Sequence, residues 1–156
     1  MPKRVLSVLL LAGVTLVTWV PADAAKRRSH RADATLSVAT ISQQGTPPAP
    51  GSSVTSAGKV SGSSFGAGAF TGDVVYGSDL SFTGPGRFFF KRGTIASTLT
   101  GFARANADGS ATFSGSGRFT GGTARYRGAR GEFTFAGTLP PGSQIATYTV
   151  TGSVKY

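Results

Sequence analysis

The sequence predicts an all-β protein with a single domain, folded as a closed barrel rather than a two-sheet sandwich. Short runs rich in β-branched and aromatic residues recur along the chain, and glycine separates them. No stretch after the first 24 residues shows helical periodicity over ten residues. The 156 residues suffice for one domain, and many of the 23 glycines fall inside predicted strands, which favours a strongly coiled barrel.

The N-terminus has the three parts of a secretory signal peptide. Two basic residues precede an uncharged apolar run over 5–20, and small residues follow at Ala22 and Ala24. We therefore expect residues 1–24 to be removed by cleavage after Ala24 and the protein to be secreted. The alternative is an uncleaved anchor, but the run is shorter than the roughly 20 apolar residues of a spanning helix. We expect no membrane span after processing.

Composition excludes several kinds of chemistry. The chain has no cysteine, which rules out disulfides, thiol nucleophiles, cysteine-ligated zinc and iron–sulfur clusters. An exported protein without cysteine is more typical of bacteria than of animals. The single histidine and six Asp+Glu residues argue against a histidine metal site and a histidine relay, so we expect no cofactor and no metal. Against those six acids stand 16 Lys+Arg, which give a net charge of +10.

The mature chain begins with a basic arm, predicted over 25–33, in which Lys26, Arg27, Arg28, His30 and Arg31 occur. Such an arm is either a solvated terminus or a tether to anionic polymers of the cell envelope. The barrel domain is predicted over 34–156. Its first strand, 34–42, alternates small polar with apolar residues, and a long loop rich in Pro, Gly and Ser is expected over 43–64.

Further strands are expected at 65–76, 80–83 and 87–92. The clearest local signal is a hairpin of 94–107 with 110–119, joined by Asp108-Gly109 as a two-residue type I′ turn. This register places Arg104 opposite Phe113. It puts Phe102, Phe113 and Phe119 on one face together with Arg104, and Leu99 and Ala103 on the other.

A second hairpin is predicted from 130–137 and a last strand over 144–156, with the prolines and glycine of 138–143 as the turn. In the first of these strands, Phe133 and Phe135 share one face. In the last strand one side carries apolar residues and glycine, namely Ala146, Tyr148, Val150, Gly152 and Val154. One apolar side per strand is typical of a barrel or a sandwich.

The stretch T-G-G-T-A-R-Y-R-G-A-R-G over 120–131 carries a family resemblance. A Gly-Gly pair, a basic-aromatic step and Ala-Arg-Gly are followed by an alternating strand, a turn and a last strand. Over 110–156 the chain resembles the allene oxide cyclase-like and dirigent-like barrels. The resemblance implies an eight-stranded antiparallel barrel of the calycin type, commonly a homotrimer, with an apolar internal cavity.

The two branches of this family differ in what they do inside the barrel. The cyclases isomerise a fatty-acid epoxide, and the dirigent proteins orient phenoxy radicals. The first predicted strand, 34–42, lacks the polar Asn and the Glu that the cyclases place early in the chain, so no catalytic residue is carried over. Dirigent proteins use cavity Asp, Arg and Tyr residues, and Asp73, Tyr76, Arg104 and Tyr148 are of these types.

The most favoured function is binding of a small apolar or aromatic molecule inside the barrel. Arg104 would lie at the barrel mouth. There it either binds a ligand carboxylate or phenolate, since a buried arginine needs a partner, or extends to solvent from the rim. The predicted ligand-binding residues are Arg104, Phe102, Phe113, Phe119, Tyr148, Tyr76 and Asp73.

Two alternatives stay open. One is an isomerase, cyclase or dirigent-type activity in the same cavity. The other is a basic surface protein that binds anionic cell-envelope polymers. Nucleic acid is not an expected partner, because alternating Arg and Phe follow from the two-residue period of a strand that faces solvent on one side.

Overall fold

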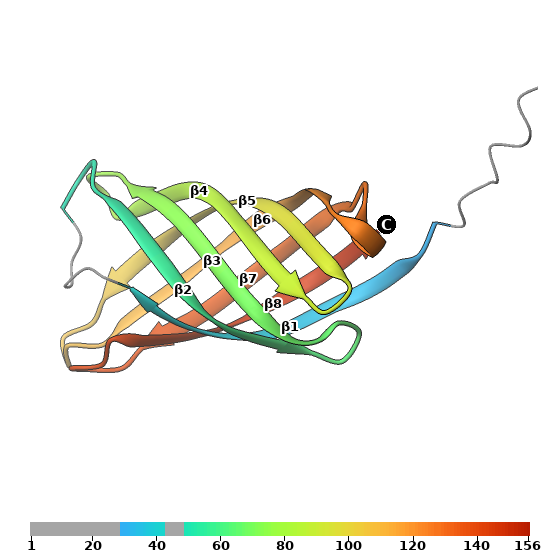
Figure 1. The fold of residues 1–156 in the computed structure, drawn as a ribbon. Helices are drawn as coiled ribbons and strands as arrows, with labels where there is room; N and C mark the ends of the chain where they lie inside the picture. The colour runs from blue at the N-terminus through green and yellow to red at the C-terminus, as the bar shows by residue number, and fades with distance from the viewer. Residues whose placement is uncertain (1–28, 43–48) are drawn as a thin grey trace, which may run out of the picture.

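The computed structural model describes residues 29–42 and 49–156 and shows an all-β protein. Eight strands form one closed barrel in which each strand pairs antiparallel with the next and β8 pairs with β1 (Figure 1). This confirms the predicted eight-stranded antiparallel barrel. The strands are β1 (Arg31–Ser42), β2 (Ser53–Gly62), β3 (Gly66–Tyr76), β4 (Ser81–Phe90), β5 (Gly93–Ala105), β6 (Ala111–Gly122), β7 (Arg130–Leu139) and β8 (Ile145–Lys155).

Between β6 and β7 the chain forms a short 3-10 helix, η1 (Ala124–Tyr126). Within 29–42 and 49–156 no helix is long and apolar enough to cross a membrane. The signal peptide predicted for 1–24, and residues 25–28 of the predicted basic arm, lie outside the described residues.

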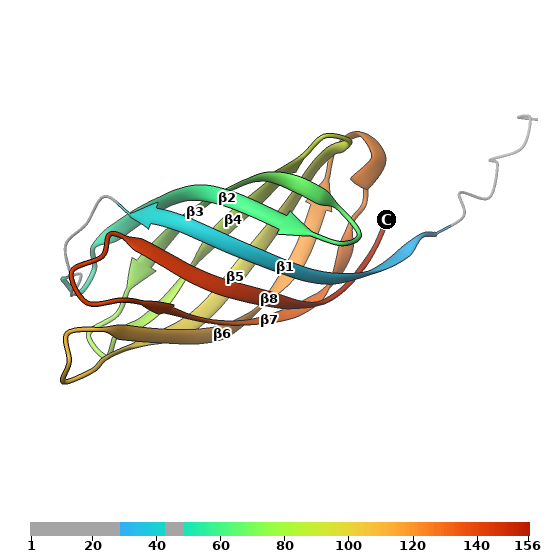
Figure 2. The same ribbon diagram turned by 90° about the horizontal axis from the view of Figure 1, so that it is seen from below.

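The barrel has two unlike ends, which Figures 1 and 2 show at the right and at the left. We call the right end the packed end; it carries η1, the C-terminus and the β2–β3 and β4–β5 turns. We call the left end the mouth end; it carries the β3–β4, β5–β6 and β7–β8 connections and the described residues 49–52. Each strand runs from one end to the other, so each strand contributes residues to both ends.

Side chains alternate between the interior and the solvent, as the two-residue period of a strand requires. In β7, Phe133 and Phe135 are buried while Glu132 and Thr134 are exposed. In β8, Val150 and Val154 are buried, whereas Thr149 is exposed. The faces predicted for these two strands are confirmed.

The packed half of the barrel is filled by aromatic rings. Phe65 packs on Phe90 with ring centroids 5.1 Å apart, and Tyr126 packs on Tyr156 at 5.0 Å. Tyr126 comes from η1, so this turn of helix inserts a ring into the end of the barrel and is buried there. Ala129, in the same connection, is fully buried. The packed end is therefore filled by ring contacts between these elements.

Glycines on inward positions make room for rings from neighbouring strands. A Cβ atom on Gly115 would lie 2.6 Å from the Phe135 ring, and one on Gly101 would lie 2.6 Å from the Phe82 ring. Both separations are too short for packed carbon atoms. The glycines inside strands thus allow large rings into a narrow barrel.

The loop predicted over 43–64 is wrong for its second half, since β2 occupies Ser53–Gly62. The strand was hidden because its inward positions are mostly small residues, with Val54 and Val60 the two buried hydrophobic ones. The arm predicted over 25–33 is also too long. Residues 31–33 belong to β1, and the His30 backbone exchanges hydrogen bonds of 2.8 and 2.9 Å with Tyr156.

The two strands predicted at 80–83 and 87–92 form one strand, β4, which runs through Pro85. Proline has no N–H to donate, so it interrupts a ladder on one side. Accordingly β3 and β4 pair at Gly72–Gly86 and again at Val75–Thr83, with no pairing between these two points. On its other side Pro85 still pairs with β5.

The register predicted for the β5–β6 hairpin is wrong by one residue. Ala103, rather than Arg104, lies opposite Phe113. The cause is the turn: the Gly109 N–H donates to the Asn106 carbonyl at 3.1 Å, and Gly109 has a φ of +80°. These features belong to a three-residue loop with a bulge, instead of a two-residue type I′ turn. A one-residue slip sends every side chain of one strand to the other face.

Candidate ligand cavity

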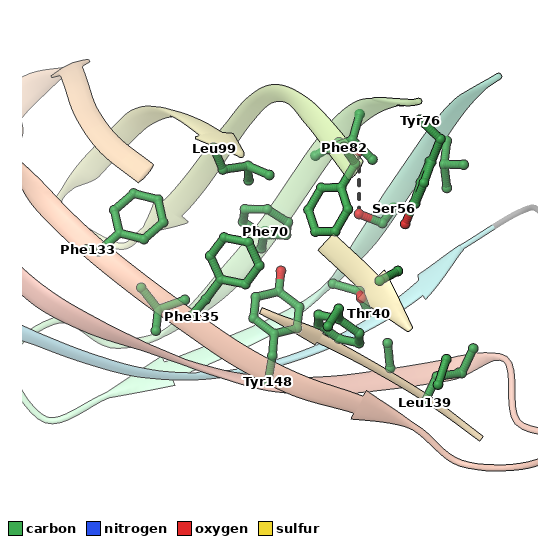
Figure 3. Close-up of a pocket in the computed structure, with 18 of the residues that line it drawn as sticks. Thr40, Ser56, Phe70, Tyr76, Phe82, Leu99, Phe133, Phe135, Leu139 and Tyr148 are labelled. Atoms are coloured by element: carbon green, nitrogen blue, oxygen red, sulfur yellow. Dashed lines mark hydrogen bonds between the residues drawn. The ribbon is translucent and has the colours of Figure 1, made fainter. Parts of the chain in front are cut away.

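An apolar cavity of about 160 Å³ occupies the mouth half of the barrel (Figure 3). It reaches from the barrel centre, where Phe70 and Phe133 lie, to the mouth end, where Tyr76 and Leu139 lie. All eight strands contribute to its wall. The lining residues are Thr40, Val54, Ser56, Phe70, Gly72, Val74, Tyr76, Phe82, Phe88, Leu99, Ala103, Ala111, Phe113, Phe133, Phe135, Leu139, Ala146, Tyr148 and Val150.

Small inward residues on several strands, among them Ala103, Ala111 and Ala146, leave room for the cavity between the larger rings. Along β5 the inward positions run from Ile95 at the packed end to Ala103 near the mouth. Along β8 they run in the opposite chain direction, from Ala146 at the mouth to Val154 at the packed end. A barrel of eight strands is wide enough for side chains to fill it or for one small ligand to bind. In this barrel the small inward residues leave interior space that side chains do not fill.

The inner part of the cavity is walled by aromatic rings. The Phe70 ring packs on Phe88 with centroids 4.9 Å apart, and Phe82 packs on Phe135 at 6.0 Å. The Tyr148 ring meets Phe70 edge-on at 6.1 Å. These contacts fix the rings against one another, so the apolar surface is formed before any ligand enters.

Four hydroxyl groups supply the polar part of the lining, from Tyr148, Tyr76, Thr40 and Ser56. Figure 3 shows the Tyr148 hydroxyl pointing into the space between the labelled rings. Within the described part of the chain, no hydrogen bond joins this hydroxyl to another protein group. Ser56 donates to the Gly72 carbonyl at a long 3.4 Å. The Tyr148 hydroxyl faces the cavity without being fully enclosed by protein, so it is available to a ligand or water.

Burial sets the protonation of the cavity tyrosines. Removal from water disfavours the charged phenolate, so burial raises the pKa of Tyr148 well above its ordinary value. Burial raises the pKa of Tyr76 in the same direction. Both side chains therefore stay neutral at physiological pH, and each hydroxyl can donate a hydrogen bond.

Among the residues that the structure describes, no charged side chain lines the cavity. The nearest acids in the mouth-end loops are held by local turns. A hydrogen bond from Ser81 lowers the pKa of Asp79, and one from Ser110 lowers the pKa of Asp108. Across residues 29–42 and 49–156, no three His, Cys, Asp or Glu side chains gather as a metal site would require.

Three of the seven predicted site residues line the cavity, namely Phe113, Tyr148 and Tyr76. Phe113 packs on Tyr148 with ring centroids 5.7 Å apart. Phe119 also points inward, but it is buried in the packed half, 4.8 Å from the Phe133 ring, and does not reach the cavity.

The remaining three predicted residues lie on the outer wall. Arg104 and Phe102 face solvent because of the one-residue register difference, and Phe102 is 61% exposed. Asp73 is also exposed, and its carboxylate accepts a 2.6 Å hydrogen bond from Thr55. The predicted arginine anchor for a carboxylate is therefore wrong: Arg104 points away from the interior.

Several cavity residues were missed by the sequence reasoning, above all Phe70, Phe82, Phe135, Leu139 and Thr40. Phe135 was placed correctly on the apolar face of its strand but was not assigned to a site. Inward alternation identifies each of these residues as an interior one. It does not show which lie at the same height in the barrel, because that depends on the register of all eight pairs.

Comparison with protein-family models, curated proteins and solved structures finds no match to this chain. The resemblance to the allene oxide cyclase-like and dirigent-like barrels stays a prediction from the 120–131 stretch.

Proposed function

We propose that the protein binds a small, neutral, apolar or aromatic molecule in the mouth half of its barrel. The observation that carries this proposal is the cavity of about 160 Å³ inside the barrel, walled largely by aromatic rings. An apolar protein cavity of about 150 Å³ stays dry and binds benzene. The ligand is thus a single aromatic ring or an aliphatic molecule of similar size.

The lining chemistry favours a neutral ligand. A carboxylate or ammonium group would lose its hydration without meeting an opposite charge, which is costly in an apolar cavity. A hydroxyl or carbonyl substituent could instead accept a hydrogen bond from Tyr148. Phe70 and Phe135 would contact the ring of such a ligand, as their position around the Tyr148 hydroxyl suggests.

The same lining supports binding more than acid–base turnover. Its titratable groups are the hydroxyls of Tyr148 and Tyr76, and burial raises the pKa of both. A general base works best with a pKa near the ambient pH. In this proposal the protein acts outside the cytoplasm, since its first 24 residues have the composition of a signal peptide.

Calorimetric titration with toluene and with p-cresol tests the proposal. Ala103→Leu fills the cavity from β5, and we expect it to weaken binding of both compounds by tenfold or more, about 1.4 kcal/mol. Ala136→Leu makes the same change on an exposed outward position of β7 and should leave binding unaltered. If the wild-type protein binds neither compound, or if Ala103→Leu binds as well as wild type, the proposal is wrong.

Tyr148→Phe then examines the polar contact separately. Removal of the hydroxyl should weaken p-cresol binding by about three- to tenfold, the usual effect of one lost hydrogen bond, and leave toluene binding unchanged. Equal losses for both ligands would mean that Tyr148 acts through its ring rather than its hydroxyl.

A further inference from the structure

The charges of the barrel are segregated between its two ends. The connections at the packed end, over 63–65, 91–92 and 123–129, contain Lys91, Arg92, Arg125 and Arg127 and no acid. The described connections at the mouth end, over 49–52, 77–80, 106–110 and 140–144, contain Asp79 and Asp108 and no Lys or Arg. The protein therefore presents a positive end and a weakly negative end.

Three further cations lie in one row across the strands at the packed end. Lys155 of β8 pairs with Arg31 of β1 on one side and with Arg130 of β7 on the other. All three are exposed on the outer wall. Like charges directly opposite each other on neighbouring strands destabilise a sheet, so this row is unfavourable in the isolated protein. We refer to these three residues as the cation row.

No described acid forms an ion pair with the cation row. The closest carboxylates along the strands are Asp33 and Glu132, two residues further into the barrel wall. Glu132 pairs with Arg118 at 3.4 Å, and this is the one ion pair within 29–42 and 49–156. The three cations of the row thus have no anionic partner among the described residues and are available to a ligand outside the barrel.

The cations of the η1 connection lie beside those of the β4–β5 turn. The Arg125 N–H donates to the Arg92 carbonyl at 3.1 Å, which brings the two backbones together. The pKa of Tyr126 reflects both side chains: burial and the nearby Tyr156 raise it, while Arg125 and Arg92 act against this. The positive surface thus extends from the cation row over the end of the barrel.

We propose that the packed end binds a linear, non-nucleic polyanion bearing closely spaced phosphate groups. Most of its cations are arginines, whose planar guanidinium groups pair with phosphate in a bidentate way. Neighbouring strands are about 5 Å apart, so the cation row can meet successive anionic groups of one chain. Single-stranded nucleic acid is the competing ligand that the test must distinguish, because Phe90 and Tyr126 are buried at this end but Phe89 and His30 are exposed.

The test compares two triple variants of the full chain that lose the same charge. Arg31→Ser/Arg130→Ser/Lys155→Ser removes the cation row. Its control, Lys59→Ser/Arg87→Ser/Arg104→Ser, removes three exposed cations elsewhere on the outer wall. Affinity for long-chain inorganic polyphosphate and for single-stranded oligo-dT is measured at several salt concentrations, after thermal unfolding shows that both variants are folded.

We expect the row variant to lose tenfold or more in polyphosphate affinity and to show a salt dependence smaller by about three in slope. The control should lose less than about threefold, since its cations lie away from the row. Equal losses in the two variants would mean that net charge alone matters and would overturn the proposal. Absence of polyphosphate binding at low salt, or tighter binding of oligo-dT than of polyphosphate at equal charge, would also overturn it.

Discussion

The two halves of the barrel are built from the same eight strands, yet one is filled with aromatic rings and the other contains a cavity. At the packed end, rings from Phe65, Phe90, Tyr126 and Tyr156 fill the interior. At the mouth end, residues such as Ala103 and Ala146 take the equivalent inward positions and leave a cavity. Ring packing that closes the barrel is thus concentrated in one half, and the cavity in which we propose that a ligand binds lies in the other.

The largest expected effect distinguishes the halves by their contribution to stability. Phe119→Ala removes a ring that is 4% exposed in the packed half, and should lower the free energy of unfolding by about 3–5 kcal/mol. Phe113→Ala removes a ring beside the cavity that is only partly buried, and should cost less than half as much. Urea unfolding of both variants measures the difference. Equal losses would show that the mouth half is packed as tightly as the other.

An effect of intermediate size is expected on the free energy of unfolding at alkaline pH. Burial raises the folded-state pKa of Tyr148, whereas the unfolded chain ionises near pH 10. The folded state therefore holds its proton longer, so this stability is complete below about pH 10 and is lost as pH rises toward the folded pKa. For one tyrosine the loss is at most about 1.4 kcal/mol per pH unit. Urea unfolding at pH 9 and pH 11 should show it in wild type and less of it in Tyr148→Phe.

The matched variant for this experiment is Tyr126→Phe at the packed end. Burial also raises the pKa of Tyr126, but Arg125 and Arg92 oppose that effect. We expect Tyr126→Phe to change the alkaline loss of stability less than Tyr148→Phe does. The reverse order would contradict the assignment of Tyr148 to the less polar environment.

The smallest effect is expected on the outer wall, where the two halves should not differ. Arg118 and Glu132 form an ion pair 3.4 Å apart, with both side chains 76% exposed. Exposed pairs of this kind contribute little, so Arg118→Ala should change the free energy of unfolding by less than about 0.5 kcal/mol. A change above 1 kcal/mol, measured by urea unfolding, would mean that the outer wall also stabilises the barrel.

Much of the fold could be predicted from the sequence because strand alternation is a local property. The faces of β7 and β8 follow directly from residues such as Phe133, Phe135 and Val150, whose pattern is unambiguous. Strand β2 could not be recognised, since Gly58 and Ser56 stand where a core strand would carry larger residues. Small inward residues weaken the apolar alternation by which a strand is recognised. Their small size also leaves space for the cavity.

The site was harder to predict because it depends on register. Asp108-Gly109 indicated a turn at the correct place, but one extra residue in the loop exchanged Ala103 for Arg104 on the inner face. That single residue decides whether the cavity has a charged or a neutral lining. Tyr148 and Phe113, two of the predicted site residues, do line the cavity, since each lies on the inward side of its strand in the observed pairing.

The central claim, that the interior is hollow only in the mouth half, is tested most directly by diffraction from crystals pressurised with xenon. Xenon enters dry apolar cavities of this size without needing hydrogen bonds. The account predicts a xenon site in contact with Phe70, Phe135 and Tyr148, and none among Phe65, Phe90 and Tyr126. An empty mouth half, or xenon bound within the packed half, would contradict it.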